Sequence, residues 1–375
     1  MLLILNIIIK IDFNILKIIL NKLFVILELS LKVKKHSIAY MKFIFELSKQ
    51  HKTIPTSEVF SCFKAEDINF KLIESNQDVL VVDIFNKYDK IKDISYRLSY
   101  TFNIDELLFS SSTSINEIKK QASKYDIKKD GSIAIRYRNR SDNINSQEIV
   151  QALGKIYSKN RNVTLKKPDI EVRVLITNLN VYVGLKVSEL DRRQFENRKV
   201  QYRPYFSPIS LHPKLARSLV NLSAIKKNEV LLDPFCGTGG ILIEAGVIGI
   251  SVVGSDIEDK MVKGCKDNLD FYNIKNYKLF SLDIGDIDIH ISNADAVVTD
   301  LPYGKSTTTK GEDIQKLYER TFKSISRVLK EGGRAVIGLS DKNMLSIGEQ
   351  YLYLLEKHDF RVHSSLTRYF GVYKK

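Results

Sequence analysis

Short apolar runs alternate with amphipathic stretches throughout the carboxyl-terminal half of the chain. The apolar runs predict strands at 229–232, 251–255, 277–282, 294–299 and 334–339. The amphipathic stretches predict helices at 240–248, 259–272, 313–330 and 343–358, and two final β-like runs cover 360–366 and 368–373. Apolar strands that alternate with helices predict an α/β fold with an open, mostly parallel sheet covered on both faces. Such sheets bind ligands beyond the carboxyl ends of their strands.

The pattern before residue 209 is more mixed and predicts smaller α+β units. Strands are expected at 41–47, 79–85, 132–138, 170–176 and 180–185, and helices at 53–63, 115–125 and 146–158. A run of Ser and Thr at 110–114 suits a linker or a helix cap.

Residues 1–40 are rich in Ile and Leu, but charged and polar side chains interrupt every window long enough to span a membrane. The basic start and the small-residue cleavage site of a signal peptide are also missing. Met41 is followed at once by the predicted strand 41–47. We therefore expect translation to begin at Met41, the preceding residues to be a leader without a domain, and no membrane partner.

The composition is typical of a globular protein in a reducing compartment. Of the 375 residues, 44% are hydrophobic and 27% are charged, which rules out a chain that is disordered throughout. The three cysteines form no C-x-x-C pair, so we expect neither a disulfide framework nor a zinc ribbon, and we expect a cytoplasmic location. The six histidines form no cluster with metal-ligand spacing, so we expect no metal.

The formal net charge of +14 is concentrated in one part of the chain. Residues 119–203 carry 20 basic and 9 acidic side chains, a net charge of +11, whereas residues 204–375 carry only +2. A concentrated basic block is typical of a surface that binds nucleic acid. A solvated charged face is the alternative.

A glycine-rich segment, 231–240, runs from the first strand of the alternating half through a loop into a helix. It has neither the spacing nor the lysine of a phosphate-binding loop, and it does not read G-x-G-x-x-G. Asp256 ends the second strand, where a carboxylate can bind both hydroxyls of a ribose, and Asp283 follows the third, where it can accept from an adenine amino group. Together with Asp233, these acids suit a nucleoside without phosphate, such as S-adenosylmethionine. The alternative is a turn that merely needs glycine.

A second motif, 297–304, ends the fourth strand beside the same crevice. An exocyclic amino group on a base is a poor nucleophile because its lone pair is conjugated into the ring, and two hydrogen-bond acceptors can draw its nitrogen towards tetrahedral geometry. Asp300 offers a carboxylate, a backbone carbonyl near Leu301 and Pro302 offers the second acceptor, and Tyr303 offers a face for stacking the base.

Together, the two motifs resemble those of the class I S-adenosylmethionine-dependent amino-methyltransferases. Within that class, the segments DPFCGTGGILIEA, TDLPYG and RPYFSPISLHPKLARSLVNL resemble the archaeal THUMP-domain tRNA (guanine-N2) methyltransferases. Members of that family modify guanosine 10 of tRNA to N2-methyl- or N2,N2-dimethylguanosine. The resemblance extends from Met41 to the carboxyl terminus. Leu301 departs from the general motif, which has a proline there.

The resemblance implies a Rossmann-like methyltransferase domain preceded by ferredoxin-like and THUMP RNA-binding domains. We expect the ferredoxin-like domain at 41–110, the THUMP domain at 111–190, a linker at 191–208 and the methyltransferase domain at 209–375. It also implies S-adenosylmethionine as cofactor and tRNA as partner, and we expect a monomer. An rRNA guanine-N2 methyltransferase, another nucleic-acid amino-methyltransferase and a non-catalytic RNA-binding protein remain alternatives.

The resemblance also implies roles for individual residues. The methionine-side loop would comprise Asp233, Pro234, Phe235, Cys236, Gly237, Thr238, Gly239 and Gly240. Asp256 would hold the ribose and Asp283 the adenine. The target amino group would be held by Asp300, Leu301, Pro302 and Tyr303. The methionine end would be closed by Phe206, Ser207, Pro208 and Ser210. Because Cys236 lies in the cofactor loop, we expect it to be a packing residue and not a nucleophile.

Overall fold

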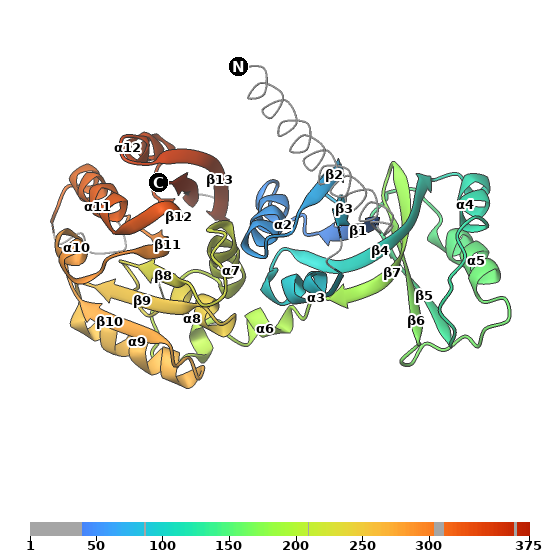
Figure 1. The fold of residues 1–375 in the computed structure, drawn as a ribbon, viewed down its shortest axis with the longest axis horizontal. Coiled ribbons are helices and arrows are strands. Elements are labelled where there is room, and N and C mark those ends of the chain that lie inside the picture. The colour runs from blue at the N-terminus through green and yellow to red at the C-terminus, as the bar shows by residue number, and fades with distance from the viewer. Residues whose placement is uncertain (1–39, 86–87, 209, 304–310, 364–365) are drawn as a thin grey trace, which may run out of the picture.

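The computed structural model describes residues 40–85, 88–208, 210–303, 311–363 and 366–375. The expected leader without a domain, residues 1–40, lies outside these ranges except for Tyr40, which is the first residue of β1. The described chain is elongated and contains two seven-stranded sheets (Figure 1). We call residues 40–189 the N-terminal body and residues 210–375 the C-terminal body.

One continuous sheet, with strand order β2-β3-β1-β4-β7-β6-β5, runs through the N-terminal body. Its strands are β1 (Tyr40–Leu47), β2 (Phe70–Ser75), β3 (Val79–Phe85), β4 (Thr101–Ser112), β5 (Ile133–Asn139), β6 (Ile170–Ile176) and β7 (Asn180–Glu189). Its helices are α2 (Ile54–Ala65), α3 (Tyr88–Arg97), α4 (Ile115–Ala122) and α5 (Ser146–Tyr157). The first six elements follow one another as βαββαβ, which is the ferredoxin-like arrangement.

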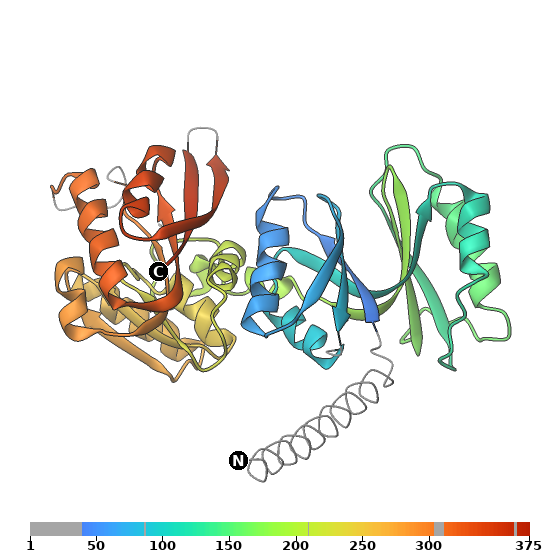
Figure 2. The same ribbon diagram turned by 45° about the horizontal axis from the view of Figure 1, so that its top comes forward.

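The long strands β4 and β7 join the ferredoxin-like unit to the unit that carries β5 and β6 (Figure 2). β4 pairs with β1 on one side and with β7 on the other, from Asn103↔Glu189 to Ser112↔Asn180. The expected boundary at residue 110 therefore falls inside β4. The Ser/Thr run there ends this strand and places Ser114 at the N-cap of α4.

The C-terminal body contains the predicted open sheet, with strand order β10-β9-β8-β11-β12-β14-β13. The first five strands are parallel to one another, and β14 runs antiparallel between β12 and β13. The strands are β8 (Val230–Asp233), β9 (Ser251–Asp256), β10 (Tyr277–Ser281), β11 (Ala294–Asp300), β12 (Leu329–Leu339), β13 (Tyr353–His363) and β14 (Leu366–Lys374). The helices are α7 (Pro213–Leu222), α8 (Gly240–Val247), α9 (Asp259–Phe271), α10 (Ile287–His290), α11 (Ile314–Val328) and α12 (Leu345–Glu349).

Both faces of this sheet are covered, as predicted. Leu231 and Val298 pack in one core cluster with α7, α8 and α9. Leu232 and Val297 point the other way, into a second cluster with α10, α11 and α12. Successive strand residues face opposite sides of a sheet, so only strands that are apolar at consecutive positions can be buried on both.

The predicted helix at 343–358 is wrong. Only a short 3₁₀ turn η3 (Lys342–Met344) and α12 are helical there, and the chain enters β13 at Tyr353. An apolar run such as 351–355 suits a buried strand as well as a helix. Pairing with β14, from Tyr353↔Lys374 to His363↔Leu366, makes it a strand. The predicted run at 368–373 is confirmed as part of β14.

Buried contacts join the two bodies. Ile54 and Tyr100 of the N-terminal body belong to a core cluster of the C-terminal body. Glu58 on α2 accepts hydrogen bonds from the backbone nitrogens of Ser99 (3.0 Å) and Tyr100 (2.9 Å) and from the side-chain amide of Asn221 on α7 (2.8 Å). The connecting segment holds α6 (Arg193–Glu196) and the 3₁₀ turn η1 (Val200–Tyr202). Across the described ranges, no helix has the length and apolar character needed to cross a membrane.

Candidate active site

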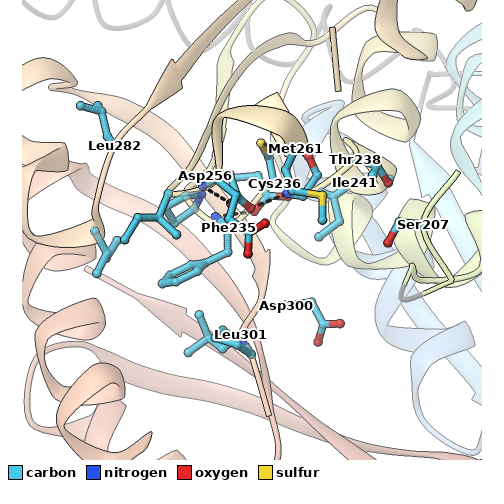
Figure 3. Close-up of a pocket in the computed structure, with 18 of the residues that line it drawn as sticks. Ser207, Phe235, Cys236, Thr238, Ile241, Asp256, Met261, Leu282, Asp300 and Leu301 are labelled. Atoms are coloured by element: carbon cyan, nitrogen blue, oxygen red, sulfur yellow. Dashed lines mark hydrogen bonds between the residues drawn. The ribbon is translucent and has the colours of Figure 1, made fainter. Parts of the chain in front are cut away.

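A cavity of about 570 Å³ lies at the carboxyl ends of the parallel strands, where the sheet predicts a ligand site (Figure 3). Asp233, Asp256 and Asp300, the last residues of β8, β9 and β11, all line it. Its volume falls within the range of about 300–1,000 Å³ that is usual for small-ligand pockets. Apolar side chains form part of its wall: Phe235, Ile257, Ile284 and Leu317.

The loop after β8 turns sharply at two glycines. Gly237 and Gly239 have φ values of +49° and +82°, in the left-handed region that favours glycine. A β-carbon at Gly239 would also approach Sγ of Cys265 to less than 3.0 Å. The turn directs the backbone nitrogen of Gly237 at Oδ2 of Asp256, 3.0 Å away. The glycines are therefore needed to bring the β8 loop against the end of β9.

The carboxylate of Asp256 lies at the end of β9 on the wall of the cavity and is fixed by the backbone. Oδ2 accepts from Gly237 N, and Oδ1 accepts from Glu258 N at 2.9 Å. A carboxylate at this place in an open α/β sheet can bind the hydroxyls of a ribose.

Asp233 is buried beneath the loop. Its Oδ1 accepts from the hydroxyl of Thr299 (2.7 Å) and from the backbone nitrogen of Phe235 (3.2 Å). Burial, together with the nearby charges of Asp256 and Asp300, raises the pKa of Asp233 to about 7 against the effect of these hydrogen bonds. A cationic ligand group beside Asp233 would favour its ionised form.

Asp283 lines the cavity and forms a salt bridge with Arg320 of α11. Arg320 was not among the residues predicted for the site. Arg320 donates to both oxygens of Asp283, with a distance of 3.0 Å to Oδ2, and also to both oxygens of Glu312. Oδ1 of Asp283 additionally accepts from Gly285 N at 2.8 Å. The hydrogen bonds from Arg320 are the main cause of the lowered pKa of Asp283. Oδ1 of Asp283 thus already accepts two hydrogen bonds, and Oδ2 accepts one from Arg320.

Asp300 lies at the other side of the cavity and contacts two residues that are far apart in the sequence. The hydroxyl of Tyr303 donates to Oδ1, and Nη1 of Arg368 on β14 lies 3.0 Å from Oδ2. The same guanidinium stands over the ring of Tyr303, 4.9 Å from its centroid. Burial raises the pKa of Asp300, whereas Arg368 and the Tyr303 hydroxyl oppose that rise.

The backbone that follows Asp300 is also held in place. Leu301 N donates to Gly338 O at 3.0 Å, and Pro302 O accepts from the hydroxyl of Tyr318 at 3.0 Å. A carbonyl oxygen has two lone pairs, so Pro302 O can accept a second hydrogen. It lies in the segment where the second acceptor for an amino group was expected.

Most of the expected site residues meet at this cavity. Its wall contains Asp233, Pro234, Phe235, Cys236, Gly237, Thr238, Gly240, Asp256, Asp283, Asp300, Leu301, Pro302 and Tyr303, together with Ser207 and Ser210. Gly239 is not part of the wall, although it shapes the loop, and neither are Phe206 and Pro208. Cys236 is buried, and a hydrogen bond with Cys265 and burial raise the pKa of its thiol well above the usual value. That disfavours the thiolate that a nucleophile needs.

The basic block does not present all of its arginines to solvent. Arg140 has only 8% of its side chain exposed and pairs with Glu46 (2.7 Å) and Asp78 (3.1 Å). Arg136 and Arg138 are more exposed, but they also have carboxylate partners, Glu171 and Glu46. Exposed lysines extend over the rest of the block: Lys119, Lys120, Lys124, Lys128, Lys129, Lys155, Lys159, Lys166 and Lys167.

Comparison with known proteins assigns the chain to a family. The RMKL-like methyltransferase domain matches residues 200–369, and the THUMP domain matches residues 112–186. The tRNA (guanine(10)-N2)-dimethyltransferase of Methanothermobacter thermautotrophicus is 33% identical over 341 residues, which cover 89% of this chain and 100% of the relative. The protein of the same name from Methanocaldococcus jannaschii is 32% identical over 358 residues, covering 88% and 99%. The chain belongs to this tRNA (guanine(10)-N2)-dimethyltransferase family.

A solved structure agrees with the fold of this dimethyltransferase family member. TrmN from Thermus thermophilus matches 89% of this chain and 99% of its own length, with a TM-score of 0.52 and 16% sequence identity. At that identity the likeness shows the fold alone. The predicted class I methyltransferase fold, with a THUMP domain on its amino-terminal side, is confirmed, and so is the family resemblance. Among the described residues, no group of three or more potential metal ligands occurs.

Proposed function

We propose that this chain transfers methyl groups from S-adenosylmethionine to the exocyclic N2 of guanosine 10 in tRNA, giving N2-methyl- and N2,N2-dimethylguanosine. The observation that carries the proposal is that one cavity is lined by Asp256, at the end of β9, and by Asp300, whose carboxylate is followed by the fixed carbonyl of Pro302. The names of the archaeal relatives support the substrate and the position.

The residues of the cavity fit the cofactor. S-adenosylmethionine supplies an electrophilic methyl group on a positively charged sulfur. Asp256 would bind the ribose, Oδ2 of Asp283 the adenine amino group, and the apolar wall the adenine ring. Asp233 would face the amino group at the methionine end, whose positive charge favours the ionised carboxylate.

Asp300 and Pro302 O would act on the substrate. Each accepts one hydrogen of the guanine amino group, which reduces the conjugation of the nitrogen lone pair with the ring. These hydrogen bonds strengthen as positive charge develops on nitrogen, so they stabilise the transition state more than the bound substrate. Afterwards the nitrogen must lose a proton, and Asp300 is placed to receive it.

The basic block would hold the tRNA. Most of the excess positive charge lies between residues 119 and 203, which run from α4 and α5 at one end of the molecule to α6 beside the C-terminal body (Figure 1). Contacts between lysine side chains and phosphates position a nucleic acid without reading its sequence.

The experiment is nucleoside mass spectrometry on an unmodified tRNA incubated with the full chain and S-adenosylmethionine. N2-methyl- and N2,N2-dimethylguanosine should form. A matched tRNA with inosine at position 10 lacks only the amino group and should remain unmodified. Methylation that persists in the inosine tRNA would overturn the position, and methylation of a different nucleoside would overturn the chemistry.

A further inference from the structure

Arg368 is a buried charged residue that the proposed function does not yet use. It lies on β14, in the last ten residues of the chain, and only 9% of it is exposed. It forms an ion pair with Asp300 and stands over the ring of Tyr303, the two side chains expected to hold the target amino group. Its Nε is buried and has no hydrogen-bond partner among the described residues.

The strand register explains how a residue two strands away reaches Asp300. Asp300 on β11 is paired with Gly338 on β12, which is paired in turn with Phe370 on β14. Arg368 lies two positions before Phe370 and therefore points to the same face of the sheet. A β-carbon at Gly338 would collide with Oδ1 of Asp300, so the glycine leaves room for the carboxylate that Arg368 meets.

We propose that Arg368 is a positioning residue of the methyl-transfer site, whose guanidinium keeps the Asp300 carboxylate ionised and fixes the ring of Tyr303 beside it. The inference rests on the proposed function and deepens it. Arg368 holds Oδ2 of Asp300, which leaves Oδ1 to the hydroxyl of Tyr303. The incoming amino group replaces that hydroxyl on Oδ1, and Tyr303 remains held through its ring by Arg368.

The charges around Asp300 make Arg368 the decisive partner. Burial alone favours a protonated carboxyl, which cannot accept at both oxygens. The other titratable groups that face it are Tyr303, Tyr318 on α11 and Asp233 on β8. The tyrosines are neutral because burial raises their pKa, and Asp233 can only add negative charge. Arg368 is therefore the only cation among the described groups that contact Asp300.

The first test compares the pH dependence of single-turnover methylation in the wild type, Arg368→Gln and Arg368→Lys. In Arg368→Gln, the acidic limb of the pH–rate profile should move to higher pH by about one to three units, as expected for a carboxylate that loses a cationic neighbour. In Arg368→Lys, which keeps a cation beside Asp300, the acidic limb should lie close to its wild-type position. Arg361→Gln, which changes an exposed arginine on the neighbouring strand β13, should not move the limb. An equal loss of rate at every pH would indicate a purely structural role and overturn the inference.

A second variant pair separates ionisation from folding. In an Asp300→Asn background the acceptor is neutral, so adding Arg368→Gln should change the rate less than threefold. The affinity for S-adenosylhomocysteine, measured by calorimetry, should remain within about twofold in Arg368→Gln and Arg368→Lys, because Arg368 is not part of the cavity wall. A large additional loss in the double variant would contradict the role proposed for Arg368.

A final measurement does not depend on activity. ¹³C NMR titration of aspartate-labelled protein, with Asp300→Asn to assign the signal, reports the pKa of Asp300 directly. That pKa should rise in Arg368→Gln by the same amount as the acidic limb. An unchanged value overturns the inference even if tRNA is methylated. A raised value in a protein that methylates no guanosine instead overturns the proposed function and leaves the Arg368–Asp300 coupling intact.

Discussion

Gly338 lies directly beside Asp300, and a β-carbon at position 338 would collide with Oδ1 of the Asp300 carboxylate. Gly338 has ordinary strand geometry, so the glycine is required by space and not by a left-handed backbone. Its importance follows from its neighbour, which no local sequence pattern reveals.

Gly338→Ala should therefore displace the carboxylate and lower the rate of methylation at least tenfold, with little effect on S-adenosylhomocysteine affinity. Single-turnover assays and calorimetry measure the two effects. The matched control is Gly154→Ala on α5, where a β-carbon would meet nothing within 4 Å. That variant should be fully active and up to about 1 kcal/mol more stable. Normal activity of Gly338→Ala would show that Asp300 can move without cost.

Asp300→Ala should lower the turnover rate by about two to three orders of magnitude, the size expected for a lost electrostatic stabiliser. The dissociation constants of tRNA and S-adenosylhomocysteine should change little, because their expected contacts lie elsewhere. A thermal melt on the same preparation tests for misfolding. A folded variant that methylates at a nearly normal rate would show that Asp300 only shapes the turn.

The stability of the protein should depend on pH through Asp233. The folded-state pKa of about 7 lies above the value of about 3.9 expected in an unfolded chain, so the native state binds the extra proton between these values. The free energy of unfolding should therefore fall as the pH rises from about 4 to 7, by up to about 1.4 kcal/mol per pH unit from this group. Above pH 7 the contribution is constant.

Asp233→Asn keeps an oxygen for the Thr299 and Phe235 donors but cannot ionise. Urea titrations at pH 5 and pH 8, without cofactor, should show a smaller loss of stability in this variant than in the wild type. Equal losses would mean that Asp233 does not titrate in this range.

Charge reversal at two lysines of the basic block, Lys166→Glu with Lys167→Glu, should weaken tRNA binding. Both are exposed, and neither has a carboxylate partner among the described residues. The slope of log affinity against log salt should decrease by about one for each lost phosphate contact. The matched control is Lys275→Glu with Lys278→Glu, two exposed lysines of which the second lies on β10, at the opposite end of the molecule (Figure 1), and it should bind normally. Equal weakening by both pairs would argue against a specific role for the basic block.

The strands of the C-terminal body were largely predictable because burial on both faces demands apolar residues at consecutive positions, as at Val297 and Val298. The glycine loop and the acids at strand ends were predictable for a similar reason, since parallel strands bring their carboxyl ends to one edge. β13 was not predictable as a strand, because its local pattern suits a helix equally well and only its pairing with β14 decides between them. The pattern also did not predict β2, α3, β4 and α7.

The partners of the site acids could not be predicted either. Arg320 and Arg368 look like ordinary surface cations in the sequence, and only the fold brings them to Asp283 and Asp300. Arg140 was expected to be exposed and is not. It follows a strand with alternating arginines, which suggests an exposed basic face, but its side chain is buried against Glu46. Charge reversal at Arg140 would leave two like charges together and destabilise the fold.

The long strands β4 and β7 have a consequence for how the N-terminal body unfolds. β4 pairs with β1 of the ferredoxin-like unit and with β7, which continues into the unit of β5 and β6. Neither unit can therefore unfold without exposing a row of unpaired backbone groups in the other. Arg140, which follows β5, also forms salt bridges with Glu46 of β1 and with Asp78, and these contacts connect the same two units. The ferredoxin-like and THUMP parts should therefore melt as one cooperative unit, and a chain cut at residue 110 would leave two halves that are insoluble apart.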